Sequence, residues 1–303
     1  MKAIGIILAG GNNNRMKELT AKRAVPALPV AGSFRAIDFS LSSMSNSHIQ
    51  TVAILTQYNA RSLNEHLSSS KWWNFGRKQG GLFLFTPTVT ADNSDWYRGT
   101  ADAMYQNIDF LKRRHEPYVI ISSGDCVYKL DFNRVLDFHI EKKSDITVVC
   151  KDMMYNDDVS RFGVVRMDDE SRITEFDEKP IEALSNTIST GIYVIRRRQL
   201  IELLEAAAEE NRFDFVNDIL VRYKNVKKIY GYKINSYWNN IADIDAYFKT
   251  NMDFLRPDVR SYFFREEPTI CSKVDDLPPA KFNPGSDISN SLVSSGCIIN
   301  GSV

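Results

Sequence analysis

The segment from Ile4 to Arg15 constrains the fold more than any other part of the chain. Residues 4–9 read Ile-Gly-Ile-Ile-Leu-Ala, without alternating polar residues, and the run ends at Gly10-Gly11. Such a run is typical of a strand buried on both faces. A glycine turn after a buried strand lets backbone N–H groups approach an anion. The segment therefore predicts either a phosphate-binding turn or a purely structural one.

The rest of the chain alternates between buried strands and amphipathic helices, which indicates a mainly parallel sheet covered on both faces. Past residue 160, successive strands without intervening helices predict antiparallel additions to the sheet. The expected strands are 51–57, 81–86, 118–122, 145–150, 162–167, 173–176, 187–195 and the extended segment 226–234. The expected helices are one ending at 47 and those at 62–67, 101–114, 132–143, 200–210 and 244–255. The predicted fold class is α/β with a mixed sheet.

Composition excludes several classes of protein. Hydrophobic residues make up 43% of the 303 residues and charged residues 25%, which is ordinary globular composition. The formal net charge is zero, so no basic field favours nucleic acid or an anionic membrane. No apolar run approaches the roughly 20 residues that span a bilayer. The four cysteines form no CxxC pair, so we expect reduced thiols, no zinc site and a cytoplasmic location.

The C-terminal part changes in composition. Prolines from Pro257 to Pro284 predict a linker over residues 256–285, after a main domain at 1–255. Val293 and Ile299, and likewise Cys297 and Val303, are six residues apart, a spacing that fits either a parallel β-helix or an ordinary pair of strands. On the first interpretation, residues 286–303 begin a β-helix that is truncated within its second repeat.

Polar residues follow several of the expected strands. Asp125 ends a buried strand, where a carboxylate could hold Mg²⁺ beside a phosphate or could instead cap a following helix. Lys179 could bind a phosphate as a point charge, or be a solvated turn residue. Thr100 is a fair candidate for a helix N-cap, and Ser189-Thr190-Gly191 for a simple bend. The chain lacks the GxGxxG fingerprint and the Walker A lysine, which argues against dinucleotide oxidoreductases and P-loop NTPases.

A series of short motifs runs through the chain. They are Leu8-Ala9-Gly10-Gly11 with Arg15, Phe34-Arg35-Ala36-Ile37-Asp38-Phe39, Leu55-Thr56-Gln57-Tyr58, Trp96-Tyr97-Arg98-Gly99-Thr100-Ala101-Asp102-Ala103, Gly124-Asp125, Phe162-Gly163-Val164, Glu178-Lys179-Pro180, Gly191-Ile192-Tyr193-Val194, Tyr237-Trp238, Asn251-Met252-Asp253 and Pro278-Pro279-Ala280-Lys281. In this order they resemble the sugar-nucleotide pyrophosphorylases, over essentially the whole chain. The segment 96–103 resembles the bacterial glucose-1-phosphate adenylyltransferases in particular.

The resemblance implies a Rossmann-like nucleotidyltransferase domain, followed by a left-handed β-helix. It also implies a reaction in which glucose 1-phosphate attacks the α-phosphorus of ATP, giving ADP-glucose and pyrophosphate. Two aspartates hold Mg²⁺ in the family, and Asp125 corresponds to one of them. The implied nucleotide-binding residues are Leu8, Ala9, Gly10, Gly11, Arg15 and Gln57. The implied sugar-phosphate-binding residues are Tyr97, Gly163, Glu178, Lys179 and Ser189.

The chain departs from the family pattern where charge is needed. Asn240 replaces the second metal-binding aspartate, and Asn239 replaces an adjacent arginine. Val25 and Asn217 stand where the family has lysines, and Asn13 stands where it has a glycine. Losing one preorganised transition-state contact costs on the order of 10²–10³ in rate. The pattern resembles the regulatory D-type subunit of glycogen biosynthesis, which assembles with a catalytic subunit, and implies weak binding of Mg²⁺ and no organic cofactor.

Three other hypotheses remain open at this point. In the first, Asp243 or Asp245 takes the place of Asn240, and the chain is itself an active Mg²⁺-dependent enzyme. A pure interaction module without ligand binding is a second alternative, and a different sugar-nucleotide specificity a third. The regulatory hypothesis expects a hetero-oligomer, such as a tetramer, that binds glucose 1-phosphate, ATP or ADP-glucose.

Overall fold

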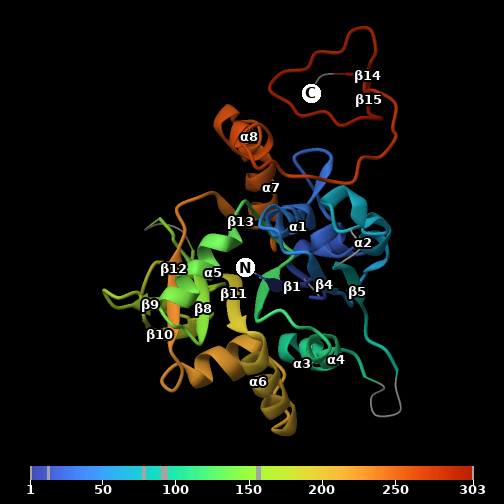
Figure 1. The fold of residues 1–303 in the computed structure, drawn as a ribbon. Helices are drawn as coiled ribbons and strands as arrows, with labels where there is room; N and C mark the ends of the chain where they lie inside the picture. The colour runs from blue at the N-terminus through green and yellow to red at the C-terminus, as the bar shows by residue number, and fades with distance from the viewer. Residues whose placement is uncertain (1, 12–13, 77–79, 90–94, 155–157, 302–303) are drawn as a thin grey trace.

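The computed structural model describes residues 2–11, 14–76, 80–89, 95–154 and 158–301. Its centre is a mixed sheet built around β1, Ala3–Leu8 (Figure 1). Side chains of β1 alternate between two cores: Ile4 and Ile6 point into one, and Ala3 and Ile7 into the other. The uninterrupted apolar run therefore reflects a strand buried on both faces.

The sheet runs in the order β12-β8-β11-β6-β1-β4-β5, and the hairpin β9–β10 pairs with the first part of β11. β11 is antiparallel to both β6 and β8, whereas β6, β1, β4 and β5 are parallel to one another. The predicted mixed, mostly parallel α/β sheet is confirmed. The strands are β4 Thr51–Leu55, β5 Gly81–Phe85, β6 Tyr118–Ser123, β8 Ile146–Asp152, β9 Gly163–Met167, β10 Ile173–Glu178, β11 Thr187–Arg196 and β12 Ile229–Lys233.

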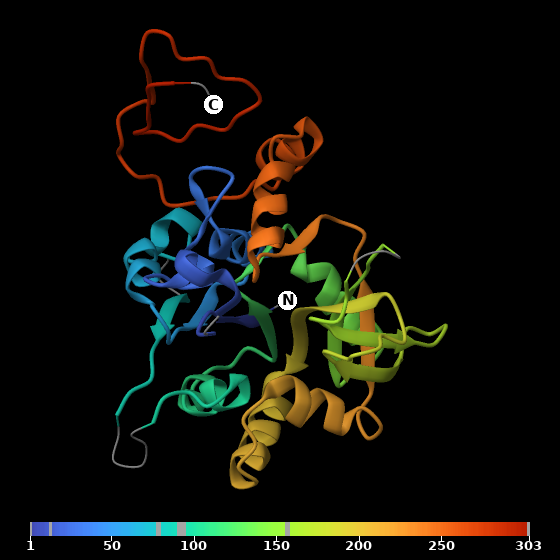
Figure 2. The ribbon, with the colours of Figure 1, turned by 180° about the vertical axis from the view of Figure 1, so that it is seen from behind.

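Helices cover both faces of this sheet (Figures 1 and 2). One face packs against α1 (Ala36–Asn46), α2 (Arg61–His66) and α5 (Phe132–Glu141). The other packs against α3 (Thr100–Tyr105), α4 (Ile108–Lys112), α6 (Arg197–Glu209) and the π-helical turn η4 (Val216–Val221). Short 3₁₀ segments are η1 Asn14–Thr20, η2 Val25–Ala27 and η3 Ser70–Trp73, and short strands are β2 Pro29–Val30 and β3 Phe34–Arg35.

The single helix predicted over residues 101–114 is two helices, α3 and α4. The break lies at Asn107, whose side-chain amide donates to the carbonyl of Ala103 at 2.8 Å and to the hydroxyl of Tyr97 at 2.9 Å. The backbone N–H of Asn107 bonds instead to Met104 O at 3.2 Å. An asparagine side chain that competes for a helix carbonyl in this way interrupts the helix.

Residues 257–264, expected to be part of a linker without helix, form the helix α8 (Pro257–Phe264). Pro257 occupies the first turn, where its missing N–H costs no helical hydrogen bond. Phe263 is completely buried and meets the rings of Phe39 and Phe254 in a third core, between α1, α7 (Ile244–Asp253) and α8. The boundary between the main domain and the linker remains a prediction.

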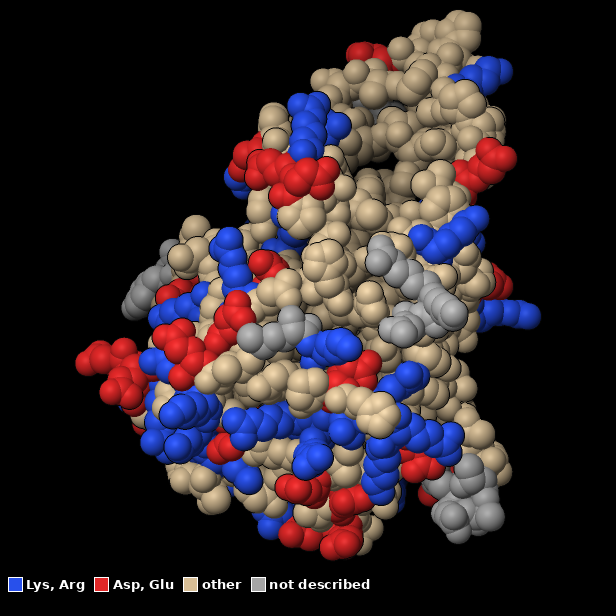
Figure 3. All heavy atoms as spheres, in the orientation of Figure 1, with Lys and Arg blue, Asp and Glu red and all other residues tan. Residues whose placement is uncertain are grey.

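Beyond α8 the chain extends away from the sheet as a loop-rich segment (Figure 2). Within it, β14 (Lys281–Phe282) and β15 (Ile298–Ile299) pair in parallel. Basic and acidic side chains are interspersed over the lower part of the face drawn in Figure 3, in agreement with the zero net charge. No helix among the described residues is long and apolar enough to cross a membrane.

We expect Phe263→Ala to lower the free energy of unfolding by about 3–5 kcal/mol, because it leaves a large cavity among buried rings. Denaturant unfolding measures this change. Phe248→Ala, which shortens a side chain that is 65% exposed on α7, serves as the control and should change it by less than about 0.5 kcal/mol. Equal losses in the two variants would contradict the assignment of α8 to the core.

A pH-dependent loss of stability is expected from His139 of α5. Burial is the main reason that its pKa is lowered from 6.5 to about 4, and the charge of Arg196 adds to the shift. The unfolded chain therefore binds the proton more readily, and stability falls by up to about 3 kcal/mol as the pH falls from 6.5 to 4. His139→Gln should remove this part of the loss in denaturant titrations at several pH values. In the control His115→Gln, which alters an exposed histidine, the loss should persist.

Candidate active site

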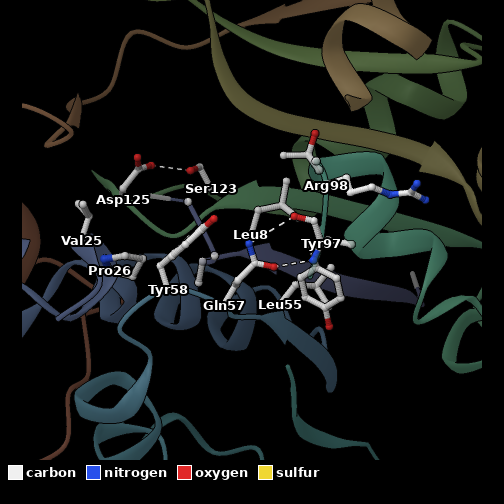
Figure 4. A pocket seen from close by; sticks show the side chains of 16 residues that line it. Leu8, Val25, Pro26, Leu55, Gln57, Tyr58, Tyr97, Arg98, Ser123 and Asp125 are labelled. Carbon is white, nitrogen blue, oxygen red and sulfur yellow. Dashed lines mark hydrogen bonds between the residues drawn. The ribbon is translucent and has the colours of Figure 1, made fainter. Parts of the chain in front are cut away.

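Three neighbouring parallel strands end together at one edge of the sheet. Leu8 of β1 is in register with Leu55 of β4 on one side and with Ser123 of β6 on the other. The residues that follow these strands therefore meet at the carboxyl edge, the usual place for ligands in such sheets. Figure 4 shows the resulting cavity of about 480 Å³. It is lined by Leu8, Ala9, Gly10, Gly11, Val25, Pro26, Leu55, Gln57, Tyr58, Tyr97, Arg98, Gly99, Thr100, Ala103, Ser123 and Asp125.

The glycine turn is required for space rather than for an unusual backbone conformation. A Cβ on Gly10 would lie 3.3 Å from the backbone nitrogen of Gln57, whereas a Cβ on Gly11 would meet no atom within 4 Å. Neither glycine adopts a positive φ. Gly11 therefore borders open space beside the cavity, as a turn that approaches a phosphate must. The departure at Asn13 lies outside the described residues.

The side chain of Gln57 is bound to the main chain of the 96–103 segment. Its Oε1 accepts from Tyr97 N at 2.6 Å, and its Nε2 donates to Tyr97 O at 3.3 Å (Figure 4). Burial raises the pKa of Tyr97, whose hydroxyl accepts from Asn107. In addition to these hydrogen bonds, the ring of Trp96 stacks on Tyr58 with centroids 5.8 Å apart. Gln57 thus fixes the segment against the end of β4.

Thr100 does not cap α3, contrary to one expectation. The N-cap position is Gly99, and the hydroxyl of Thr100 accepts from Phe215 N at 2.9 Å. A Cβ on Gly99 would lie 2.3 Å from the carbonyl oxygen of Phe213, so this position has no room for a side chain. The guanidinium of Arg98 lies 3.8 Å from the ring centroid of Phe213. The 96–103 segment is therefore held on its other side by residues 213–215.

A second cavity, of about 440 Å³, adjoins the first, because Ser123 and Asp125 line both. It is lined by Arg15, Ser123, Asp125, Cys126, Arg161, Phe162, Gly163, Glu178, Lys179, Ser189, Thr190, Gly191, Tyr193, Val216, Trp238, Asn240 and Ala242. The predicted nucleotide residues line the first cavity, except Arg15, which lines the second. The predicted sugar-phosphate residues line the second, except Tyr97, which lines the first.

Asp125 lies at the junction of the two cavities. Its carboxylate accepts from the Ser123 hydroxyl at 2.5 Å, as Figure 4 shows, and its backbone carbonyl accepts from Ile241 N at 2.9 Å. The residues after it form the strand β7 (Cys126–Tyr128), so the alternative role as a helix cap is wrong. The Asp125 side chain is therefore available to a ligand that reaches from one cavity to the other.

Asn240 lies beside Asp125 on the strand β13 (Trp238–Asn240). It pairs with Cys126 in the β13–β7 ladder, its Oδ1 accepts from Ala242 N at 3.0 Å, and its Nδ2 donates to Cys126 Sγ at 3.4 Å. Burial, reinforced by Asp125, raises the pKa of Cys126 well above its usual value, which keeps the thiol neutral. Asn240 thus presents no charge at this place.

The residues present fit a Mg²⁺ ion only in part. Mg²⁺ takes one or two carboxylates together with substrate phosphates. Asp125 supplies one carboxylate, and the oxygen of Asn240 is already bonded to the backbone. Over the described ranges, no group of three or more His, Cys, Asp or Glu side chains is placed to hold a metal. Asp243, a candidate replacement, has one carboxylate oxygen on Ala246 N and the other on Arg161.

The residues of the hairpin β9–β10 and of β11 form the far wall of the second cavity. Lys179 Nζ lies 3.1 Å from Glu178 Oε1, and the lysine side chain is 60% exposed. A Cβ on Gly163 would come within 2.9 Å of Glu178 Oε2, so the glycine leaves room for that carboxylate. The Ser189 hydroxyl donates to that of Tyr193 at 3.3 Å and accepts from Gly191 N. The Lys179 side chain is therefore accessible, as binding of a phosphate requires.

Two features of the site were not predicted from the sequence. Arg161 lines the second cavity and forms an ion pair with Asp243. The only signal in the sequence was its position directly before the Phe162-Gly163 motif. Val25 lines the first cavity but is only 4% exposed and packs in the third core, so the position at which the family pattern predicts a lysine holds a core residue.

Comparison with known proteins agrees with this architecture. A sequence model of the nucleotidyl transferase family matches residues 4–256. The glucose-1-phosphate adenylyltransferase of Clostridium acetobutylicum is 39% identical over 99% of this chain and 80% of its own length. Those of Clostridium novyi and Geobacillus stearothermophilus are 37% and 35% identical, over 79% of their own lengths. The chain therefore belongs to the glucose-1-phosphate adenylyltransferase family of nucleotidyl transferases, which confirms the resemblance at the level of the family.

We expect Gln57→Leu to release the main chain of Tyr97, since both hydrogen bonds are lost. Hydrogen exchange of the Tyr97 amide should accelerate by roughly tenfold or more, as expected when a buried donor loses its acceptor. Gln106→Leu is the matched control, because Gln106 bonds to Asp102 and not to Tyr97. Unchanged hydrogen exchange at the Tyr97 amide in Gln57→Leu would show that the Gln57 hydrogen bonds do not hold the 96–103 segment.

Proposed function

We propose that this chain is a regulatory subunit of an ADP-glucose-forming enzyme of glycogen biosynthesis, with little catalysis of its own. It binds glucose 1-phosphate and ATP or ADP-glucose, and it acts with a catalytic homologue in a hetero-oligomer, such as a tetramer, in the cytoplasm. The observation that carries the proposal is that the neutral Asn240, beside Cys126 in the β13–β7 ladder, lines the second cavity together with the carboxylate of Asp125.

The first step of the argument is the charge that the reaction needs. Transfer of an adenylyl group brings two anionic phosphates together, so positive charge must be placed between them. Asn240 contributes no second carboxylate for Mg²⁺, and Val25 places an alkyl side chain in the nucleotide cavity. Each loss weakens charge neutralisation where it matters most, and the two together lower the rate more than either alone.

The second step is that the binding surface remains. The glycine turn with Gln57, the exposed Lys179 and the cleared space at Gly163 surround two connected cavities. These features support binding of a nucleotide in the first cavity and of a sugar phosphate in the second. The proposal includes the predicted ligand contacts of Leu8, Ala9, Gly10, Gly11, Tyr97, Glu178 and Ser189. It also includes a ligand contact of Arg15, which lines the second cavity. They favour a ligand-binding subunit over a pure scaffold.

Asp125 and the phosphates of a ligand would hold Mg²⁺. With a single protein carboxylate as ligand, the ion would bind weakly. When bound, it would neutralise phosphate charge. The chain's own contribution is to orient the two ligands: β1 and β4 present the glycine turn and Gln57 to one, and the β9–β10 hairpin presents Lys179 to the other.

The alternative function is that the chain is itself an active Mg²⁺-dependent glucose-1-phosphate adenylyltransferase. The observation that favours it is that Asp125 is retained at the junction and lines both cavities. The engagement of both carboxylate oxygens of Asp243 weighs against a replacement ligand from that residue.

We also propose that residues 286–303 begin a left-handed β-helix. The parallel pairing of β14 with β15 supports this, because the coils of a β-helix stack through parallel strands.

The purified chain, given Mg²⁺, ATP and glucose 1-phosphate, should release pyrophosphate at least about 10²-fold more slowly than the usual enzyme range of roughly 1–10³ s⁻¹. Asn240→Asp combined with Val25→Lys should raise this rate, because the pair restores a carboxylate and a cation. Thermal unfolding monitors whether the buried Val25 tolerates lysine. Addition of the catalytic homologue from the same source should give a complex that is more active than either chain alone.

Turnover by the unaltered chain within the ordinary range would refute the regulatory assignment and establish the alternative. Failure of the two chains to co-purify would refute the hetero-oligomer. As a matched control, Asn239→Asp places a carboxylate on the same strand, beside Asn240, and should leave the rate low.

A further inference from the structure

Arg161 and Asp243 form an ion pair at the edge of the second cavity. Arg161 lies two residues before β9, and Asp243 is the N-cap residue of α7. Each side chain is 25% exposed, so the pair is accessible from the cavity and partly shielded from water. The guanidinium also lies 4.7 Å from the ring centroid of Phe162, which limits its movement.

The cap on α7 does not require this ion pair. Asp243 Oδ1 accepts from Ala246 N at 2.7 Å, and that single bond caps the helix, whereas Oδ2 contacts Arg161. Asparagine or threonine in this position caps a helix in the same way without a charge. The negative charge of Asp243 therefore has a separate consequence, which is to neutralise Arg161.

Arg161 is one of three basic residues that line the second cavity, beside the carboxylates of Asp125 and Glu178. Arg15 and Lys179 line the same cavity, and the carboxylate of Glu178 is paired with Lys179. Burial lowers the pKa of Arg161; the nearby charge of Arg15 acts in the same direction, and those of Asp158 and Asp125 oppose it. A guanidinium that lines a cavity can donate two parallel hydrogen bonds to a phosphate, for which arginine is well suited.

We propose that Arg161 binds the phosphate of a sugar phosphate monoester in the second cavity, and that Asp243 competes with that phosphate for the guanidinium. This inference rests on the proposed function, since it takes the second cavity as the sugar-phosphate site. When the sugar phosphate binds, its phosphate replaces the Asp243 carboxylate as the anionic partner of Arg161. Binding then needs no metal, because Arg161 supplies positive charge beside the neutral Asn240.

The test is calorimetric titration of the full chain with glucose 1-phosphate in EDTA. Arg161→Gln should weaken binding by at least about tenfold, as expected for loss of a charged hydrogen-bond donor. Asp243→Asn keeps the helix cap but removes the competing charge, so it should strengthen binding by roughly threefold to fivefold. In the double variant, Asp243→Asn should change the affinity by less than about twofold relative to Arg161→Gln, because its effect acts through Arg161.

Arg166→Gln is the matched control. Arg166 lies on β9, is 52% exposed and pairs with Glu175 away from both cavities, so its loss should leave the affinity unchanged. Glucose, which lacks the phosphate, should not distinguish Arg161→Gln from the unaltered chain. Thermal unfolding of each variant separates loss of binding from loss of fold.

Unchanged affinity in Arg161→Gln, weaker binding in Asp243→Asn, or no binding of glucose 1-phosphate to the unaltered chain would each overturn the inference. The first two outcomes leave the proposed function standing, whereas the third would also refute its ligand-binding part; the pyrophosphate assay decides whether the chain is catalytically weak. A chain that turns over rapidly while Arg161→Gln weakens binding would refute the proposed function and leave the role of Arg161 standing.

Discussion

The parallel pairing of β1 with β4 and β6 is the constraint on which the rest of the site depends. It aligns Leu8 with Leu55 and with Ser123, so that three chain reversals occur at one edge. Backbone bonds continue past the strand ends, from Ala9 N to Leu55 O and from Gly124 N to Leu8 O, and extend this alignment into the loops. Without that register, the glycine turn, Gln57 and Asp125 would not border a common space.

The sheet and most of its helices follow from patterns that can be seen in the sequence. Apolar runs such as residues 4–8 require burial on both faces, and topology then places Asp125 and the glycine turn at the same edge. The break at Asn107 could not be predicted, because it depends on a side chain that competes with the backbone, which periodicity does not record. Helix α8 does not follow from the sequence if Pro257 is counted as a helix breaker, because proline is in fact favoured in a first turn.

The charged and neutral residues of the site likewise include some that the sequence predicts and some that only the structure reveals. The neutral residues Asn240 and Val25 could be recognised from the motifs, because a motif specifies the residue type at each position. The pairing of Arg161 with Asp243 joins residues that are distant in the sequence, and only the fold brings the N-terminus of α7 to the residues before β9. A sequence thus shows that a charged residue is absent more readily than it shows which ion pairs the remaining charged residues form.

The long strand β11 links the two halves of the site. Its second half pairs with β6, which leads to Asp125, and its first half pairs with β9, which begins at Gly163. Where β11 pairs with β8, the register shifts between Ser189 and Tyr193. Side chains of a strand alternate between faces, so deletion of a single residue within this irregular stretch would invert the facing of every residue on one side of it. The length of the bulge is therefore fixed by geometry, and chains descended from this one can vary its residue types far more freely than their number.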